Sequence, residues 1–147
     1  MGIALLSAQR SKDPANQIGA CIINAKKRIV GIGYNGFPAG CSDEHFPWGK
    51  DENILEDKRT YVVHAEANAI LNAQGSLDGC TLYVGLFPCN ECTKLIIQSG
   101  IKKIIYLSDE DAHKDHNKAA KKMIQHAGIE LEHFQPKKQS LLIDFQK

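Results

Sequence analysis

The sequence predicts an α/β fold in which a mixed β-sheet carries helices on both faces. Two short apolar runs near the N-terminus flank a basic turn, as in an antiparallel hairpin. From His64 onward, strand-like and helix-like apolar segments alternate regularly. This alternation is typical of parallel strands joined by crossover helices. Added to the hairpin, it gives a sheet with both parallel and antiparallel neighbours.

The N-terminal part is expected to hold the end of a helix, a polar turn and the hairpin. Their positions are 3–9 for the helix, 11–14 for the turn, and 19–24 and 28–34 for the strands. The segment from Asn35 to Lys58 is rich in Gly, Pro, Asp and Glu and shows little periodicity. Loops of this length in compact domains are usually functional or disordered.

The C-terminal part is expected to contain three helices, each with one buried apolar stripe. The helices are predicted at 64–73, 89–99 and 116–127, and the strands at 81–84, 103–107 and 129–134, with an edge strand at 141–145. The stripes are Ala67, Ile70 and Leu71 in the first helix, Leu95 and Ile96 in the second, and Ala119, Ala120, Met123, Ile124 and Ala127 in the third.

The bulk composition fits a single globular domain over residues 1–147. The chain has 43% hydrophobic and 24% charged residues, and its length allows a sizeable core. A net charge of +1 gives no electrostatic basis for binding nucleic acid or a membrane surface. No apolar run is long enough to span a bilayer, and the N-terminus does not look like a signal peptide. Five cysteines form an odd set with one metal-type pair, so a reducing, cytoplasmic location is expected. The first helix begins abruptly after Met1-Gly2, so the possibility that the sequence comes from a longer chain stays open.

Two short motifs predict a metal site. His64 stands two residues before Glu66, and Cys89 and Cys92 form a C-x-x-C pair after a proline. One imidazole and two thiols suit Zn²⁺, and three protein ligands leave a fourth tetrahedral position open for water, as in catalytic sites. Glu66 is then close to the metal without binding it, which suits a proton carrier. The alternative is a structural zinc with Glu66 as surface charge, which three ligands do not favour.

The combined pattern H-x-E…P-C-x-x-C is the signature of zinc nucleobase deaminases. Around it, the chain resembles the dCMP deaminase family of the cytidine deaminase superfamily over about residues 5–145. The resemblance rests on Ser11-Lys12-Asp13-Pro14, Gly33-Tyr34-Asn35-Gly36, Gly40-Cys41-Ser42-Asp43, Pro47-Trp48, His64-Ala65-Glu66-Ala67-Asn68-Ala69-Ile70 and Phe87-Pro88-Cys89-Asn90-Glu91-Cys92.

This resemblance implies a three-layer α/β/α cytidine deaminase-like sandwich with a five-stranded mixed sheet. The implied reaction is zinc-dependent hydrolysis of dCMP to dUMP and ammonia, which supplies dUMP for thymidylate synthesis. Glu66 would move protons between water, ring N3 and the departing amine. The Ala65 backbone N–H would meet the base carbonyl, and Asn35 would bind the sugar and base edge.

The resemblance also implies a homo-oligomer, often a hexamer, that dCTP activates and dTTP inhibits. A divalent cation such as Mg²⁺ would accompany the effector. Tyr34, Gly36 and Gly40 lie in the segment that this similarity connects with the subunit interface and the effector site. The alternative is an ordered surface loop whose glycines only turn the chain.

The phosphate of a nucleotide substrate needs a site as well. Several family members use a basic residue in the turn before the first strand, which here indicates Ser11 and Lys12. Asp13 departs from a purely basic cradle and leaves this point open. Elsewhere, Cys41 and His45 do not form a complete second metal site. Residues 113–116 are expected to be a solvated helix start rather than ligands.

Other functions remain to be separated. A deaminase of dCTP would share every motif above, whereas a nucleoside deaminase would not need the long segment 35–58 or a phosphate pocket. A nucleic-acid-editing deaminase would need a basic surface that a net charge of +1 does not supply. A catalytically silent nucleotide sensor is disfavoured by the intact Glu66.

Overall fold

The structure, a computed structural model, describes residues 1–138 and 140–143, and it is built on one five-stranded mixed sheet. The strand order is β2-β1-β3-β4-β5. β1 runs antiparallel to both β2 and β3, whereas β3, β4 and β5 are parallel, so the predicted mixed sheet is confirmed. The strands are β1 Gly19–Ile23, β2 Ile29–Tyr34, β3 Thr81–Leu86, β4 Lys103–Ser108 and β5 Glu130–His133.

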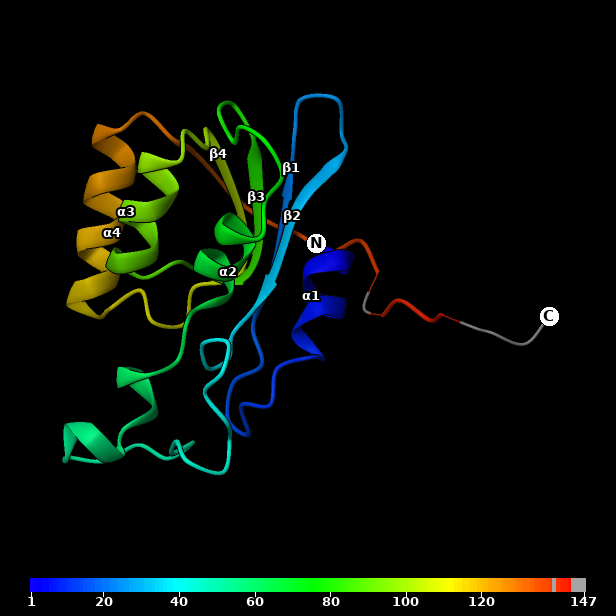
Figure 1. Cartoon of the computed structure of the whole chain (residues 1–147). Coiled ribbons are helices and arrows are strands. Elements are labelled where there is room, and N and C mark those ends of the chain that lie inside the picture. The colour runs from blue at the N-terminus through cyan, green and yellow to red at the C-terminus, as the bar shows by residue number, and fades with distance from the viewer. Residues whose placement is uncertain (139, 144–147) are drawn as a thin grey trace.

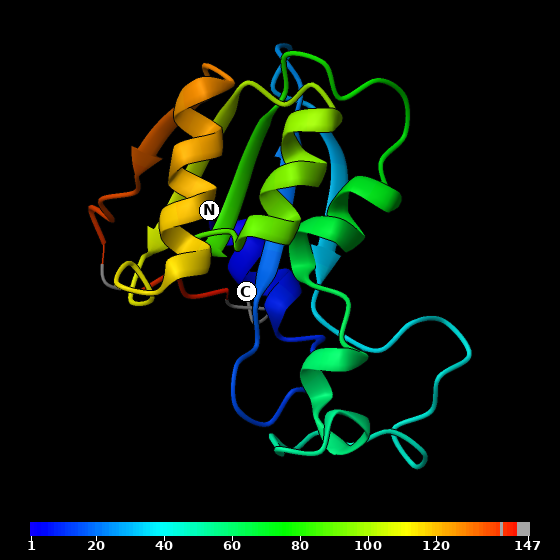
Figure 2. The same cartoon turned by 90° about the vertical axis from the view of Figure 1, so that its left-hand side faces the viewer.

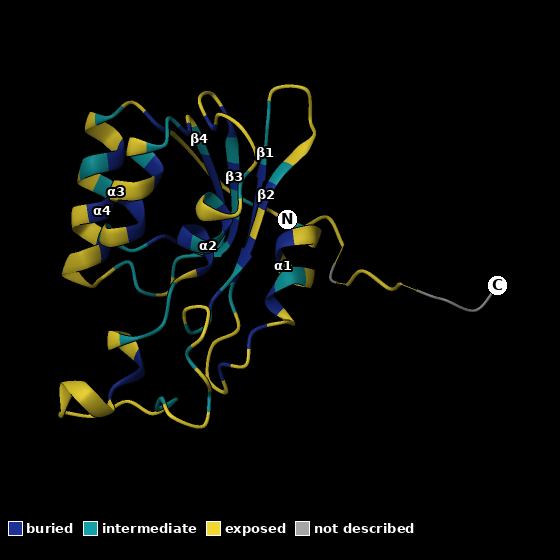
Figure 3. Ribbon diagram, viewed as in Figure 1, coloured by how far each residue is buried: buried dark blue, intermediate teal, exposed yellow. Residues whose placement is uncertain are grey.

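Helices cover both faces of the sheet and complete three layers (Figures 1 and 2). One face carries α1 (Gly2–Ala8), and the other carries α2 (Ala65–Leu71), α3 (Asn90–Gln98) and α4 (Asp115–His126). The main core lies between the sheet and these last three helices, where the facing sides are buried (Figure 3). Its fully buried members include Ile22, Leu82, Val84, Ile96, Ile104 and Ile124.

Two glycines of β2 let α2 lie directly against the sheet. A Cβ on Gly33 would stand 2.3 Å from both the Ala65 carbonyl oxygen and the Ala69 nitrogen. A Cβ on Gly31 would stand 2.4 Å from the Ala69 carbonyl oxygen. Both distances are far inside van der Waals contact, so only glycine permits this approach. The first turn of α2, which carries Ala65 and Glu66, is positioned by this contact.

The long segment after β2 is ordered around a small aromatic cluster. The Phe37 ring lies 4.2 Å from Trp48 and 5.7 Å from Phe46, and Phe46 lies 5.0 Å from Tyr61, measured between ring centroids. Two short 3₁₀ helices, Ile54–Glu56 and Lys58–Thr60, follow the middle of the segment. The whole segment extends beyond one end of the sheet (Figures 1 and 2). Of the two expectations for it, functional or disordered, the structure excludes disorder.

Several expected details are wrong. Leu71 is 77% exposed and Leu95 is 46% exposed, although both were assigned to buried stripes. Ala119 is exposed as well. α2 contacts the sheet through Ala65 and Ala69, and Leu71, two residues beyond Ala69, points the opposite way. Residues 141–143 are exposed and form no strand, and the rest of the expected edge strand lies outside the described residues. No helix of the described residues is long and apolar enough to cross a membrane.

Candidate active site

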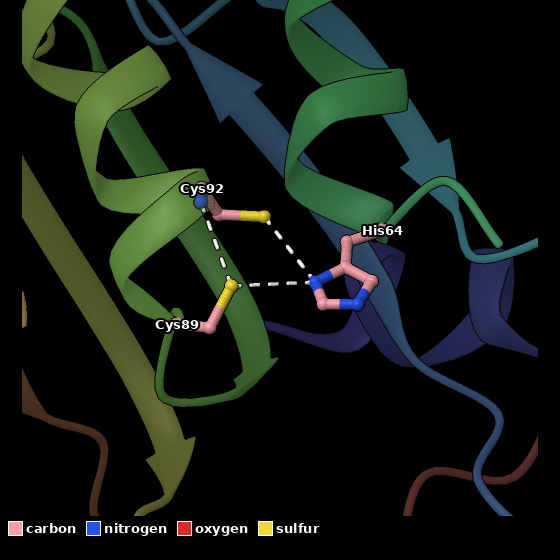
Figure 4. A group of neighbouring side chains, drawn as sticks. All are labelled: His64, Cys89 and Cys92. Carbon is pink, nitrogen blue, oxygen red and sulfur yellow. Dashed lines mark hydrogen bonds between the residues drawn. The ribbon is translucent and has the colours of Figure 1, made fainter. Parts of the chain in front are cut away.

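The three predicted metal ligands come from the starts of two helices. His64 is the N-cap residue of α2, and Cys89 is the N-cap residue of α3. Cys92 lies in the first turn of α3, and its backbone N–H donates to Cys89 Sγ over 3.5 Å. The three side chains point toward one another (Figure 4). The alternation of strand and helix therefore brings together residues that are up to 28 positions apart.

The spacing of the ligand atoms fits zinc. His64 Nδ1 lies 3.5 Å from Cys89 Sγ and 3.4 Å from Cys92 Sγ. With Zn–N and Zn–S bonds of about 2.0 and 2.3 Å, tetrahedral geometry places nitrogen and sulfur about 3.5 Å apart. Within residues 1–138 and 140–143, no other three His, Cys, Asp or Glu side chains form such a group. The Cys41 and His45 pair and the start of α4 therefore give no second metal cluster in this part of the chain.

The cluster is electrostatically prepared for a cation. Hydrogen bonds from the Cys92 thiol and the His64 ring lower the pKa of Cys89 well below its usual value. The proton shared with Cys89, together with burial, raises the pKa of Cys92. One thiolate is thus favoured in the protein itself. A divalent ion bound here would displace the second proton, because metal ligation requires thiolates.

Glu66 lies in the first turn of α2 and is 5% exposed. Burial raises the pKa of its carboxyl above the usual value, and the neighbouring His64 opposes this shift. A carboxyl with a raised pKa near a catalytic centre can both accept and return a proton close to neutral pH. The position and the environment of Glu66 therefore both suit a proton carrier.

These groups open onto a cavity of about 450 Å³. That volume is within the range of small-molecule sites. His64, Ala65, Glu66 and Cys89 line it, and so does the buried Asn35. Asn35 Oδ1 accepts the Ile18 backbone N–H over 2.8 Å, and its Nδ2 donates to the Asn16 carbonyl over 2.9 Å. The cavity thus collects two of the three predicted metal ligands, Glu66 and two of the predicted substrate-binding residues.

Ser11 and Lys12 do not line the cavity. The Lys12 side chain is 72% exposed and forms an ion pair with Asp43. Ser11 is buried, and its hydroxyl accepts the Asp13 backbone N–H over 3.2 Å. The basic side chains around the cavity are instead Lys50, Lys58, Arg59, Lys114 and His116.

The sequence alone does not indicate these basic residues. Lys50 lies in the segment without periodicity, and His116 was interpreted as part of a solvated helix start. Lys58, Arg59 and Lys114 pair with Asp13, Asp57 and Asp111, respectively. Lys50 and His116 form no ion pair or side-chain hydrogen bond within the described part of the chain. For Arg59 and Lys114, an acidic residue two or three positions earlier in the chain was the only local signal.

The residues assigned to an effector site also lie outside this cavity. The Tyr34 carbonyl accepts a hydrogen bond from Asn68 over 2.8 Å, and the Arg10 guanidinium lies 5.4 Å from the Tyr34 ring centre. Gly36 pairs with Val63 in an isolated bridge that closes the base of the long segment. Gly40 is exposed and has a φ of +87°.

The family model for the cytidine and deoxycytidylate deaminase zinc-binding region matches residues 1–108. The chain belongs to this family. A probable deoxycytidylate deaminase of Drosophila melanogaster is 55% identical over 99% of this chain and 75% of its own length. The deoxycytidylate deaminase of Homo sapiens is 53% identical over 99% of this chain and 83% of its own length. Family membership and fold therefore agree.

Among solved structures, the chain is similar to the dCMP deaminase of cyanophage S-TIM5 in complex with dCMP and dUMP. The identity is 27%, the TM-score is 0.72, and the match covers 89% of this chain and 90% of the phage chain. This likeness supports the three-layer deaminase architecture described above.

Proposed function

We propose that this chain is a zinc-dependent hydrolase that converts dCMP and water to dUMP and ammonia, and so supplies dUMP for thymidylate synthesis. The observation that carries the proposal is a buried Glu66 that lines one cavity together with His64 and Cys89, two members of the zinc-compatible set that Cys92 completes. Relatives named deoxycytidylate deaminase at more than 50% identity support the choice of substrate. A neighbour solved with dCMP and dUMP supports it further.

The three metal ligands, Glu66 and the backbone of Ala65 each have a task in this reaction. His64, Cys89 and Cys92 would hold Zn²⁺, which when bound supplies Lewis acidity that lowers the pKa of a coordinated water toward about 7. Glu66 accepts a proton from the attacking water and delivers it to ring N3. It then takes the remaining proton from the new C4 hydroxyl and gives it to the departing amine. The backbone N–H of Ala65 donates to the base carbonyl. The base thereby gains an oxygen at C4 and loses ammonia.

Asn35 is suited to a ligand that donates a hydrogen bond. Both N–H bonds of its side chain have acceptors within the protein, at Asn16 and Asp13. Its Oδ1 accepts one N–H, from Ile18, and a carbonyl oxygen has two lone pairs. The second lone pair is the group that would accept a deoxyribose hydroxyl.

The phosphate is proposed to bind Lys50, Lys114 and His116, at the rim of the cavity, rather than Ser11 and Lys12. Lys50 and His116 form no ion pair among the described residues, and Lys114 pairs with the partly exposed Asp111, which also lies near His116. Replacing Lys50 or Lys114 by Ala should lower kcat/KM for dCMP by about tenfold, as expected for losing one charged hydrogen bond, and leave deoxycytidine use unchanged. Lys12→Ala is the comparison, and a selective loss of dCMP use there would favour the assignment made from the sequence.

Assembly and control are proposed from the family resemblance alone. The chain would form a homo-oligomer, with a hexamer favoured, and dCTP with Mg²⁺ would activate it while dTTP inhibits it. Tyr34, Gly36 and Gly40 are the proposed effector-site residues. An effector acts only through different affinities for two states, so dCMP saturation should be sigmoidal without dCTP and hyperbolic with it.

One assay tests the function and its control together. Ammonia release is measured from dCMP, dCTP, deoxycytidine and cytidine, each with and without dTTP, and from dCMP also with dCTP as effector. The proposal expects dCMP to be preferred. Preference for dCTP would reassign the substrate, and no release from any of the four would overturn the proposed function. Hyperbolic kinetics that are indifferent to both triphosphates would remove the regulatory part only.

A further inference from the structure

One wall of the cavity contains a buried ion pair that joins distant parts of the chain. Lys58 Nζ lies 2.6 Å from Asp13 Oδ1 and 2.7 Å from Asp13 Oδ2. Only 7% of the Lys58 side chain and 3% of the Asp13 side chain are exposed. Both residues line the cavity, although 45 positions separate them. A charge pair of this kind must be well hydrogen-bonded to be tolerated away from water.

The Asp13 carboxylate also organises the chain on its own side of the cavity. It accepts the backbone N–H groups of Ala15 over 2.8 Å and Asn16 over 3.1 Å. Its Oδ2 lies 3.4 Å from Asn35 Nδ2. Burial by itself would raise the pKa of Asp13, but hydrogen bonds from Lys58 and the two N–H groups offset this and keep the pKa below its usual value. Asp13 is therefore an anion that holds the Asn16 turn and the amide of Asn35 together.

Lys58 holds the opposite side. Its backbone N–H donates to the Gly49 carbonyl over 2.9 Å, and its own carbonyl accepts the N–H groups of Tyr61 and Val62. The backbone of Lys58 thereby joins Gly49, within the long segment, to residues 61 and 62, where the chain turns back toward His64. The ammonium group then connects this segment to Asp13, and through Asp13 to Asn35.

We propose that Asp13 and Lys58 are positioning residues that orient the Asn35 amide so that its Oδ1 faces the sugar of the substrate. The identity of the ligand rests on the proposed function. The pair acts through Asn35. Lys58 is not assigned to the phosphate, because the Asp13 carboxylate neutralises its charge and takes two of its three N–H donors. The Asn16 carbonyl and the Ile18 N–H also hold the amide. Without the anion, Nδ2 loses one of its two acceptors and the amide is held less firmly in its present orientation.

The test removes both charges together. Lys58→Met alone would leave a buried carboxylate without its partner and risk unfolding, so the main variant is Asp13→Asn with Lys58→Met. Asp13→Asn can still accept the backbone N–H groups but presents an NH₂ group to Asn35 Nδ2. We expect KM to rise about tenfold for both dCMP and deoxycytidine, as for the loss of one oriented hydrogen bond. KM is informative because it does not depend on how much of the protein is folded.

Two further variants give the comparison. Lys103→Met breaks an ion pair with Glu130 and Glu132 outside the cavity and should leave KM unchanged. Lys58→Gln keeps an N–H donor for Asp13 and should raise KM only about threefold, less than the full loss. If the double variant does not fold, the KM of Lys58→Gln is used for the test instead.

A cycle with Asn35→Ala decides whether the pair acts through Asn35. Residues that act through one another are not additive, so the double variant should add almost nothing to KM once Asn35 is Ala. Additive effects, or an unchanged KM in folded protein with normal zinc content, would overturn the proposal. A rise for dCMP alone would overturn it too, since it would mean that Lys58 binds phosphate.

This outcome is separable from failure of the proposed function. If the unmodified protein deaminates none of the four nucleosides and nucleotides, the function is wrong, but the orientation of Asn35 is still measurable. The side-chain amide resonances of Asn35 should shift in the double variant and not in Lys103→Met. Unshifted resonances in the folded double variant would contradict the positioning role independently of activity.

Discussion

Glu66 combines a polar function with an apolar environment. It lies two residues after a metal ligand, is almost fully buried, and has a carboxyl pKa raised mainly by that burial. A carboxyl in water would stay ionised near neutral pH and return protons poorly. In this position the protonated and ionised forms are closer in free energy, which allows the same group to take and give a proton.

Glu66→Gln separates this chemistry from binding. The amide keeps the size and hydrogen-bonding capacity of the side chain but cannot accept the proton, so kcat should fall by at least about 10²–10⁴-fold. Zinc content should remain about one ion per subunit, because Glu66 is not a ligand. Steady-state kinetics and metal analysis on the same sample check both points, and turnover close to that of the unmodified protein would rule out Glu66 as the proton carrier.

At the scale of elements, the site depends on how closely α2 approaches β2. Gly31 and Gly33 remove the side chains that would otherwise hold the helix away. The first turn of α2 carries both Ala65, whose N–H is assigned to the base carbonyl, and Glu66. A shift of this helix by less than 1 Å would move both groups relative to Cys89 and Cys92.

Gly33→Ala tests this dependence. Its Cβ would meet backbone atoms at 2.3 Å, which cannot move aside as a side chain can. We expect a loss of about 1–3 kcal/mol in the free energy of unfolding, as for overpacked cores, together with a clear fall in kcat. Gly85→Ala in β3 is the matched control, because its nearest contact would be Leu5 Cδ2 at an ordinary 3.8 Å. Urea denaturation and steady-state kinetics are measured for both variants. Equal losses of stability and kcat in Gly33→Ala and Gly85→Ala would contradict the close packing of α2 against β2.

The sequence predicted these elements better than their contacts. Strand and helix periodicity located all five strands, although it also predicted a strand at 141–145 that residues 141–143 do not form. The H-x-E and C-x-x-C spacing predicted the group of His64, Cys89 and Cys92 that the fold brings together, because such spacing is a local signal. The exposure of Leu71 and Leu95 depends on how α2 and α3 are rotated against the sheet, which hydrophobicity alone does not fix. The contact of Lys58 with Asp13 could not be predicted either, because the two residues are 45 positions apart and only the folded loop brings them together.

For the whole molecule, the metal site ties the two halves of the chain together. His64 follows the long segment and begins α2, whereas Cys89 and Cys92 belong to the turn after β3 and to α3. An ion bound by all three restrains the movement of these parts relative to one another. Because such a site does not exist in the unfolded chain, its binding free energy adds to stability.

Removing the zinc should therefore lower Tm as well as activity. For free zinc at about 1,000 times Kd, the stabilisation is about 4 kcal/mol, or about 10 °C in Tm for a chain of this length. Calorimetry before and after treatment with a chelator measures the shift. Cys92→Ser should lose most of the chelator response, while Glu66→Gln should keep it. An unchanged Tm on complete removal of zinc would mean that the ion does not contribute to the stability of the fold.

The aromatic cluster of the long segment gives the protein an optical label of its own. Trp48 is the single tryptophan of the chain, and it packs against Phe37 in a tilted arrangement while its Nε1 donates to Asp43. Asp43 also pairs with Lys12, so the indole is connected to the turn before β1. Light absorbed at the red edge of the protein spectrum is thus emitted from this segment alone, and the α/β/α layers remain dark. Emission from the unlabelled protein can therefore follow rearrangements of the segment while a nucleotide is titrated.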